Sequence, residues 1–172
     1  FPLALYDACK DYGIPFAHFS SGCIYEGTIT DVNADPNFFG STYSVSKGVS
    51  DVILKNKLNT LLFRVRLPFD SSHSPKNLLT KLYNYSQKSK LIEGGENSIT
   101  DIDEAVMTAA KLIEKDVRGV YNLVQWGPVT TKKIAEMMGL KAEWYTPEEF
   151  KQVTTAKRSN CVIPAYEHMT PV

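Results

Sequence analysis

Two short apolar segments on either side of a helix-length segment constrain the fold more than any other feature of this chain. Residues 15–20 and 60–67 each predict a buried strand. Between them, residues 41–56 predict a helix with the apolar stripe Val45, Val49, Val52 and Ile53. Because strands joined through a helix usually run parallel, the pattern indicates an α/β fold with a parallel sheet.

The remaining segments continue this alternation. Residues 1–12 predict a helix that ends at Gly13, and residues 91–92 and 119–124 predict strands. Further helices are predicted at 77–85, at 102–114 with Asp101 as its cap, after Thr130, and at the capping box of Thr146. The helix at 102–114 is expected to face inward with Val106, Ala109, Ala110 and Ile113.

Charge and cysteine content narrow the class of protein. The 172 residues contain 19 Lys and Arg against 19 Asp and Glu, so nothing favours a nucleic-acid or membrane-surface partner. No apolar run approaches the roughly 20 residues of a membrane span. Cys9, Cys23 and Cys161 are far apart and lack metal-ligand spacing, which predicts no metal site, no disulfide framework and a reducing, cytoplasmic setting.

The residue pattern that points to chemistry is Tyr43-Ser-Val-Ser-Lys47, preceded by Ser21-Gly-Cys23. Residues four apart on a helix share a face, and an ammonium fixed beside a phenol favours the phenolate. Such a phenol can exchange a proton with a carbonyl or alcohol oxygen near neutral pH. Taken alone, the pair is also compatible with an ordinary amphipathic helix. Ser21 and Cys23 follow a predicted strand, however, and catalytic residues of parallel sheets gather at such ends.

The spacing of Ser21, Tyr43 and Lys47 resembles the extended short-chain dehydrogenase/reductase superfamily. Within it, Ser21-Gly-Cys23-Ile-Tyr25 is similar to a segment of GDP-fucose synthases and of the epimerase/reductase domain of plant UDP-rhamnose synthases, which are related to dTDP-4-dehydrorhamnose reductases. The resemblance to the plant domain spans nearly the whole chain. It continues through Leu62-x-Arg-Val-Arg-Leu-Pro68, Pro75-Lys-Asn-x-x-Thr-Lys81, Asn97-Ser-x-Thr100, Arg118-Gly-x-x-Asn122 and Arg158-Ser-Asn160.

The resemblance implies a fold and a cofactor. It implies the C-terminal part of a Rossmann-type doubly wound parallel sheet in residues 1–70, and a small mixed α/β substrate-binding region in residues 71–172. The cofactor would be NADPH or NADH, held in part by Tyr43 and Lys47. No G-x-G-x-x-G loop occurs, and Gly94-Gly95 does not lie between a strand and a helix. We therefore expect the main cofactor-binding loop to lie outside this chain, and these residues alone to be inactive and to bind NADPH weakly.

The resemblance also implies a reaction, in which a nucleotide-linked 4-keto-6-deoxyhexose is epimerised at C3 and C5 and then reduced at C4. Cys23 and Lys81 would be the acid and base of the epimerisation. In the reduction, Tyr43 would give a proton to the C4 oxygen, beside Lys47. Ser21 would hydrogen-bond that oxygen, with Ser20 as an adjacent alternative.

Other polar residues have weaker assignments. Arg158 and Asn160 are expected to hold the nucleotide-sugar, with Asn77 and Asn97 as further candidates. Arg64 and Arg66 are expected to pair with carboxylates, and His18 to be a core histidine. Members of the superfamily often form homodimers through the helices that correspond here to residues 1–12 and 41–56.

Two alternatives stay open from the sequence. In one, the protein is a monofunctional dTDP-4-dehydrorhamnose reductase, or an NAD-dependent sugar epimerase or dehydratase, and Cys23 is a bystander. In the other, it is a non-catalytic, reductase-like interaction module. The nucleotide, the final hexose and the oligomeric state are left open as well.

Overall fold

A three-stranded parallel sheet, β1-β3-β7, organises the computed structural model, which describes residues 1–155 and 157–172. The helices are α1 (Pro2–Asp11), α2 (Thr42–Lys55), α3 (Leu78–Ser86), α4 (Ile102–Glu114), α5 (Thr131–Met137), α6 (Pro147–Val153) and the short 3₁₀ helix η1 (Gly22–Ile24). The strands are β1 (Phe16–Ser21), β2 (Gly27–Thr28), β3 (Thr60–Val65), β4 (Pro68–Phe69), β5 (Leu91–Ile92), β6 (Thr100–Asp101), β7 (Gly119–Asn122), β8 (Trp144–Tyr145) and β9 (Cys161–Val162). The predicted parallel α/β class is confirmed.

Strand β3 lies at the centre of the sheet and is buried on both faces. Its residues pair with β1 from Phe16↔Thr60 to Ser21↔Val65, and with β7 on the other side. Because side chains alternate along a strand, Leu61 and Phe63 point to one face and Leu62 to the other. The apolar run predicted at 60–67 is therefore that of a strand covered on both sides.

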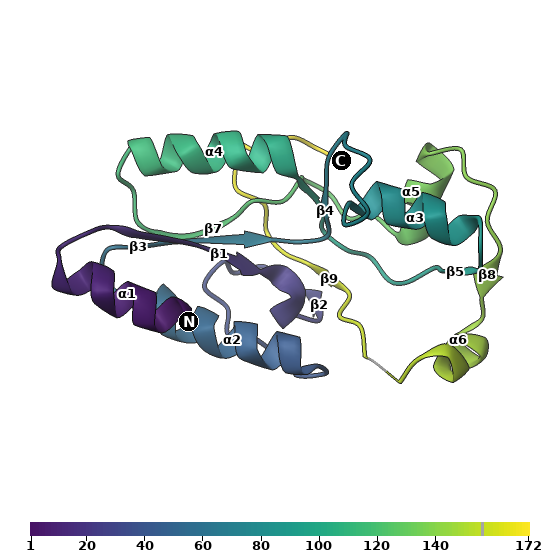
Figure 1. The fold of residues 1–172 in the computed structure, drawn as a ribbon, viewed down its shortest axis with the longest axis horizontal. Coiled ribbons are helices and arrows are strands. Elements are labelled where there is room, and N and C mark those ends of the chain that lie inside the picture. The colour runs from purple at the N-terminus through teal and green to yellow at the C-terminus, as the bar shows by residue number, and fades with distance from the viewer. Residues whose placement is uncertain (156) are drawn as a thin grey trace.

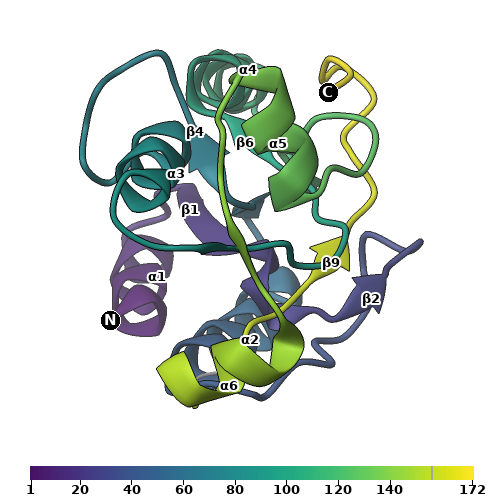
Figure 2. The ribbon, with the colours of Figure 1, turned by 90° about the vertical axis from the view of Figure 1, so that its right-hand side faces the viewer.

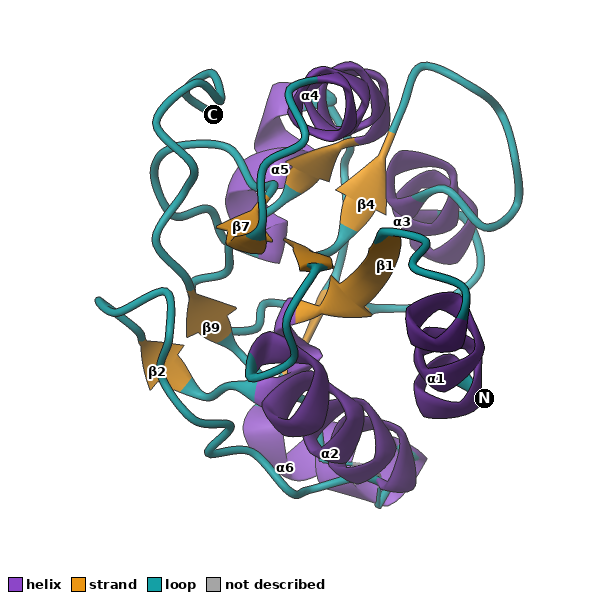
Figure 3. Cartoon of the chain, turned by 90° about the vertical axis from the view of Figure 1, so that its left-hand side faces the viewer, coloured by secondary structure: helices purple, strands orange, loops and turns teal. Residues whose placement is uncertain are grey.

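The helices divide between the two faces of the sheet, with α4 on one side and α1 and α2 on the other (Figures 1 and 3). Both crossovers, β1 to β3 and β3 to β7, step in the same direction across the sheet. Since their helices lie on opposite faces, the two crossovers have opposite hands. Strand β7 lies well after residue 70 but belongs to the same sheet as β1 and β3. The predicted division of the chain into regions 1–70 and 71–172 stays a prediction.

The predicted apolar stripe of helix α2 does not face the sheet. The predicted stripe of Val45, Val49, Val52 and Ile53 is 36–55% exposed. The face that packs on β1, β3 and η1 instead carries Ser44, Gly48, Asp51 and Leu54. A Cβ added to Gly48 would lie 3.3 Å from Pro36, so this residue allows the helix to approach closely.

Helix α4 also departs from its predicted face. Ala109 is buried as expected, but Val106 and Ile113 are about half exposed and Ala110 is exposed. Ala105, Thr108, Ala109 and Leu112 form its buried side. Two of these four residues are alanines, which let α4 lie close to Leu61 and Phe63. No helix among the described residues is long and apolar enough to span a bilayer.

A second group of elements packs beyond the carboxyl ends of the sheet (Figure 2). It contains α3, α5 and α6 with the parallel pairs β4/β6 and β5/β8. Its core includes Leu82, Leu91, Ile99, Val129 and Ile134. The pair β2/β9, from opposite ends of the sequence, joins this group to the loop after η1.

The helix starts follow the predicted caps. The side chains of Asp101 and Thr130 accept hydrogen bonds from backbone amides in the first turns of α4 and α5. Thr146 and Glu149 form the predicted capping box of α6. These signals are local, which is why the sequence was sufficient to find them.

A buried ion pair between Arg64 and Asp51 fastens β3 to α2. Arg64 Nε and Nη2 donate to the two Asp51 carboxylate oxygens at 2.8 and 2.5 Å. Arg64 is 1% exposed and Asp51 is 0% exposed. Ser20 donates to the same carboxylate at 3.0 Å, so β1 is tied to this pair as well. The predicted carboxylate partner of Arg64 is confirmed.

We expect Asp51→Asn to lower the free energy of unfolding by about 3–5 kcal/mol, because it leaves the Arg64 cation buried without an anion. Urea unfolding followed by circular dichroism measures this. Asp35→Asn is the matched control: Asp35 also pairs with a cation, Lys55, at 2.7 Å, but its side chain is 82% exposed. A similar loss of stability in both variants would contradict the role given to the buried pair.

Candidate active site

Ser21 and Cys23 lie where β1 ends and η1 begins. The Ser21 hydroxyl accepts a hydrogen bond from the Cys23 amide at 3.1 Å, so it caps the short helix. Ser20, one residue earlier, points to the other face and donates to Asp51. The Ser20 hydroxyl is thus engaged in the ion-pair cluster, and Ser21 is the serine on the Cys23 side of the strand end.

Tyr43 and Lys47 lie one turn apart at the start of α2. Ser41 caps this helix by accepting from the Ser44 amide at 3.1 Å. The Lys47 Nζ is 6.0 Å from the centre of the Tyr43 ring, and the Tyr43 side chain is about half exposed. The pair therefore shares a helix face and is open to solvent, as a proton donor to an external substrate must be.

His18 lies on the side of β1 that faces Lys47 and Asp51. Burial and, secondly, the Lys47 ammonium lower the pKa of His18, while Asp51 acts in the opposite direction. Its ring stacks on Phe16 with a centroid separation of 6.0 Å. His18 is half-buried, so its side chain is only partly enclosed by the protein.

The residue that contacts Cys23 most directly is Arg66. Its Nη1 donates to the Cys23 sulfur at 2.9 Å. Its Nη2 donates to the Asn97 side-chain oxygen and to the Ser159 carbonyl. The expectation that Arg66 pairs with a carboxylate is wrong: it follows the end of β3, where its side chain reaches across to η1 rather than to α2.

Asn97 and Asn160 belong to the same network. The Asn97 amide nitrogen donates to Asn160 Oδ1 at 3.2 Å, and the Gly95 amide donates to the same oxygen at 3.1 Å. Asn97 Oδ1 also accepts from the Cys161 amide at 3.1 Å. The Asn160 backbone amide donates to the Glu26 carboxylate. Arg66 thus joins Cys23 to Asn97, and Asn97 in turn contacts Asn160.

The other three predicted residues have no contact with the Cys23 network among the described residues: Asn77 and Lys81 lie at α3, and Arg158 follows α6. Asn77 is buried and caps α3, and its amide nitrogen donates to Asp70 and Ser72, so it organises the preceding loop. Lys81 is exposed on α3. Arg158 is exposed, and its guanidinium lies 5.2 Å from the centre of the Phe150 ring.

Arg66 is the residue that sequence reasoning assigned incorrectly. One signal was available, because Val65 pairs with Ser21 and both strands end at the same edge of the sheet. Arg66 therefore follows directly on a position that faces the catalytic serine candidate. Position alone, however, does not tell whether a side chain turns toward the neighbouring strand end or back toward a helix.

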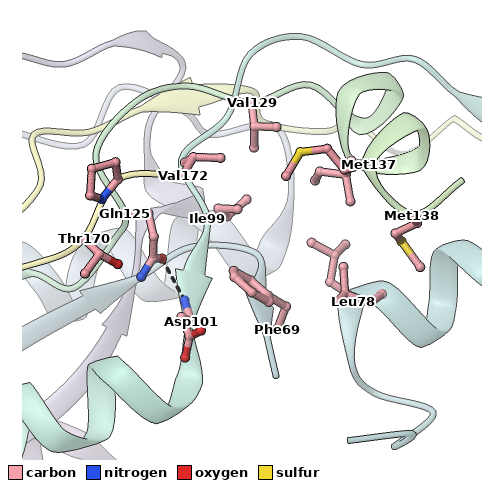
Figure 4. Close-up of a pocket in the computed structure, with 13 residues that line it drawn as sticks. Phe69, Leu78, Ile99, Asp101, Gln125, Val129, Met137, Met138, Thr170 and Val172 are labelled. Atoms are coloured by element: carbon pink, nitrogen blue, oxygen red, sulfur yellow. Dashed lines mark hydrogen bonds between the residues drawn. The ribbon is translucent and has the colours of Figure 1, made fainter. Parts of the chain in front are cut away.

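An apolar pocket of about 260 Å³ lies among α3, α5, β6 and the C-terminal residues (Figure 4). Figure 4 shows Phe69, Ile99 and Met137 projecting into it. At its polar side, the Asp101 amide donates to Gln125 Oε1 at 2.7 Å. None of the predicted site residues lines this pocket, so it is separate from the Cys23 network.

The fold and site define an α/β protein of the reductase/epimerase type. No family model matches the chain. It is 31% identical over 92% of its length to two Arabidopsis thaliana proteins. One is a trifunctional UDP-glucose 4,6-dehydratase/UDP-4-keto-6-deoxy-D-glucose 3,5-epimerase/UDP-4-keto-L-rhamnose-reductase, and the other a bifunctional dTDP-4-dehydrorhamnose 3,5-epimerase/dTDP-4-dehydrorhamnose reductase. The chain spans 26% and 56% of these relatives.

Solved structures agree. The UDP-rhamnose synthase L780 of Acanthamoeba polyphaga mimivirus superposes with a TM-score of 0.87 at 26% identity, covering 99% of this chain and 66% of that one. The dTDP-4-dehydrorhamnose reductase of Bacillus anthracis, solved with NADP, superposes with a TM-score of 0.70 at 15% identity, covering 95% and 64%, and supports the fold alone. The chain is thus similar to plant epimerase/reductases, and its resemblance to the plant UDP-rhamnose synthases is confirmed.

We expect Cys161 to resist alkylation in the folded protein. Burial is the main cause that raises the pKa of its thiol to about 11, so at pH 8 only about one molecule in a thousand carries the reactive thiolate. Iodoacetamide treatment followed by peptide mass spectrometry, with and without urea, measures this. Cys9, which is half-buried on α1, is the internal control. Modification of folded Cys161 at the rate of Cys9 would contradict the expectation.

Proposed function

We propose that this chain carries the acid/base residues of an NAD(P)H-dependent epimerase/reductase that acts on a nucleotide-linked 4-keto-6-deoxyhexose. The observation that carries the proposal is the Cys23 thiol at the end of β1, beside Ser21 and in contact with a buried arginine. Reduction would use Ser21, Tyr43 and Lys47 with a cofactor hydride, and it requires no thiol. A thiol in this position adds the group that proton exchange at carbon requires. The two plant relatives, whose names include both activities, support the same reading.

In the epimerisation, the C4 ketone acidifies the hydrogens on C3 and C5. A base removes one as a proton: the C–H bond breaks, and its electron pair delocalises onto the C4 oxygen. An acid then returns a proton from the opposite face. Cys23 and Lys81 are the proposed pair, since they come from separate segments, η1 and α3. The exposed Lys81 amine and the half-buried thiol could then approach the sugar ring from different sides.

In the reduction, Tyr43 gives a proton to the C4 oxygen, and Ser21 donates a hydrogen bond to it. Lys47, whose ammonium lies over the Tyr43 ring, keeps positive charge beside the phenol and stabilises the phenolate that proton donation leaves. The cofactor, when bound, supplies the hydride for C4. Tyr43 and Lys47 fit its nicotinamide ribose end, because Tyr43 is about half exposed and Lys47 is not enclosed.

The nucleotide-sugar is proposed to lie along residues 71–172, with residues 1–70 supplying the strand ends and α2. Arg158 offers guanidinium N–H groups for phosphate oxygens, because the exposed guanidinium contacts Phe150 by lying over the aromatic ring. Asn97, which contacts Arg66, hydrogen-bonds Asn160, two residues after Arg158 in the chain. Asn77 would act by holding the loop at residues 70–77 in place.

We also propose a homodimer built on α1 and α2. The exposed residues Val45, Val49 and Val52 recur every three or four positions, so they form one apolar stripe along α2. Leu5 of the neighbouring α1 is 44% exposed. An apolar helix stripe turned away from the core is typical of a surface that a second molecule covers.

Because the main cofactor-binding loop is expected outside this chain, the reaction is tested with the full-length protein, incubated with UDP-4-keto-6-deoxyglucose and NADPH in D₂O. We expect deuterium at C3 and C5 of the product and unlabelled hydrogen at C4, measured by NMR. Cys23→Ala should lose the exchange by about 10²–10⁴-fold but still reduce pre-epimerised substrate. Tyr43→Phe should lose the reduction by a similar factor and keep the exchange.

The outcomes separate the alternatives. Reduction without deuterium incorporation would leave a monofunctional reductase in which Cys23 is a bystander. The absence of both reactions would favour a non-catalytic module. Equal loss of both activities in Cys23→Ala would contradict the division of roles.

The dimer is tested by light scattering after gel filtration. We expect Val49→Asp to shift the protein from twice the chain mass to the monomer mass, because it places a charge in the apolar stripe. Val153→Asp is the control: Val153 is exposed to a similar extent, 58% against 55%, but lies on α6. A wild-type protein of monomer mass would refute the homodimer.

A further inference from the structure

The Arg66 guanidinium is buried at the junction of three segments. It is 2% exposed and donates to the Cys23 sulfur, the Asn97 side chain and the Ser159 carbonyl. Its Nε is buried and has no hydrogen-bond partner in residues 1–155 and 157–172. Arg66 therefore fixes Cys23 relative to the segments around residues 97 and 159.

The charge of Arg66 is not neutralised within the described part of the chain. The ion pairs found there include Arg64 with Asp51, but none contains Arg66. Two buried arginines, two residues apart, thus differ in one respect: the first faces a carboxylate and the second a thiol. A buried cation without an anion is costly, and the Cys23 sulfur can become that anion by losing its proton.

We propose that Arg66 is the positioning residue of Cys23: it holds the sulfur in place and stabilises it as the thiolate during proton exchange at carbon. This rests on the proposed epimerase/reductase function. Whether Cys23 takes a proton from the sugar or gives one to it, the sulfur is a thiolate on one side of that step. A guanidinium at hydrogen-bond distance stabilises that state through a charge-assisted bond.

The other ionisable groups nearby do not replace Cys23. Cys161 donates its thiol proton to the Gly22 carbonyl at 3.2 Å, and burial raises its pKa to about 11 although Arg66 acts to lower it. The Glu26 carboxylate accepts from the Asn160 amide on the far side of the network. Cys23 is the ionisable group that receives a hydrogen bond from Arg66.

Arg66→Met and Arg66→Lys test the proposal in the deuterium assay. We expect Arg66→Met to slow exchange at C3 and C5 by roughly 10- to 100-fold, the effect of losing one hydrogen bond to a charged group. Reduction of pre-epimerised substrate should fall much less, and Arg66→Lys should recover part of the exchange. Equal losses in both reactions, or no recovery with lysine, would overturn the proposal in favour of a structural role.

Thiol reactivity tests the same pair without the enzyme assay. In the wild-type protein at pH 7.5, iodoacetamide should alkylate Cys23 faster than Cys9, which is also half-buried, because a thiolate displaces iodide and a thiol does not. Arg66→Met should slow the alkylation of Cys23 by about tenfold and leave the alkylation rate of Cys9 unchanged. If wild-type Cys23 is alkylated no faster than Cys9, the proposal is overturned, even if Arg66→Met fails to fold. Wild-type full-length protein without exchange or reduction would refute the proposed function, while alkylation would still decide the Arg66–Cys23 pair.

Discussion

The buried ion pair of Arg64 and Asp51 is the interaction on which the arrangement of the site depends. It joins the central strand to α2, and Ser20 adds β1 to the same carboxylate. Because Asp51 must face the sheet, residues three and seven positions earlier, Gly48 and Ser44, face it too. This rotation turns the valine stripe outward and leaves Tyr43 at the solvent-exposed start of the helix.

Local signals made much of the fold predictable. Asp101, Thr130 and Thr146 mark helix starts because a side-chain oxygen satisfies backbone amides within the same turn, and no distant contact is needed. The central strand was equally clear, since an apolar run of this length fits a strand covered on both faces. Ser21, Tyr43 and Lys47 could be proposed for the same reason: strand ends and helix turns place them by local rules.

The helix faces and the role of Arg66 could not be obtained in this way. An apolar stripe indicates that some surface is covered, but not whether the sheet or another molecule covers it. For α2, one buried aspartate outweighed three valines, because an unpaired Arg64 would be more costly than exposed methyl groups. Arg66 contacts residues 23, 97 and 159, and contacts over such separations follow from tertiary structure rather than from sequence period.

Arg64 in β3 and Arg66 just after it illustrate how neighbouring residues can serve stability and chemistry separately. Arg64 lies within the strand, where a helix covers it and a carboxylate neutralises it. Arg66 lies past the strand end, where the sheet gives way to the turns that carry Cys23, Asn97 and Ser159. A buried cation without an anion at the carboxyl end of a parallel strand stabilises negative charge that forms beside it. Under the proposed function, enolate formation creates such charge transiently, and an unneutralised arginine would suit a thiol that changes its protonation state during proton exchange.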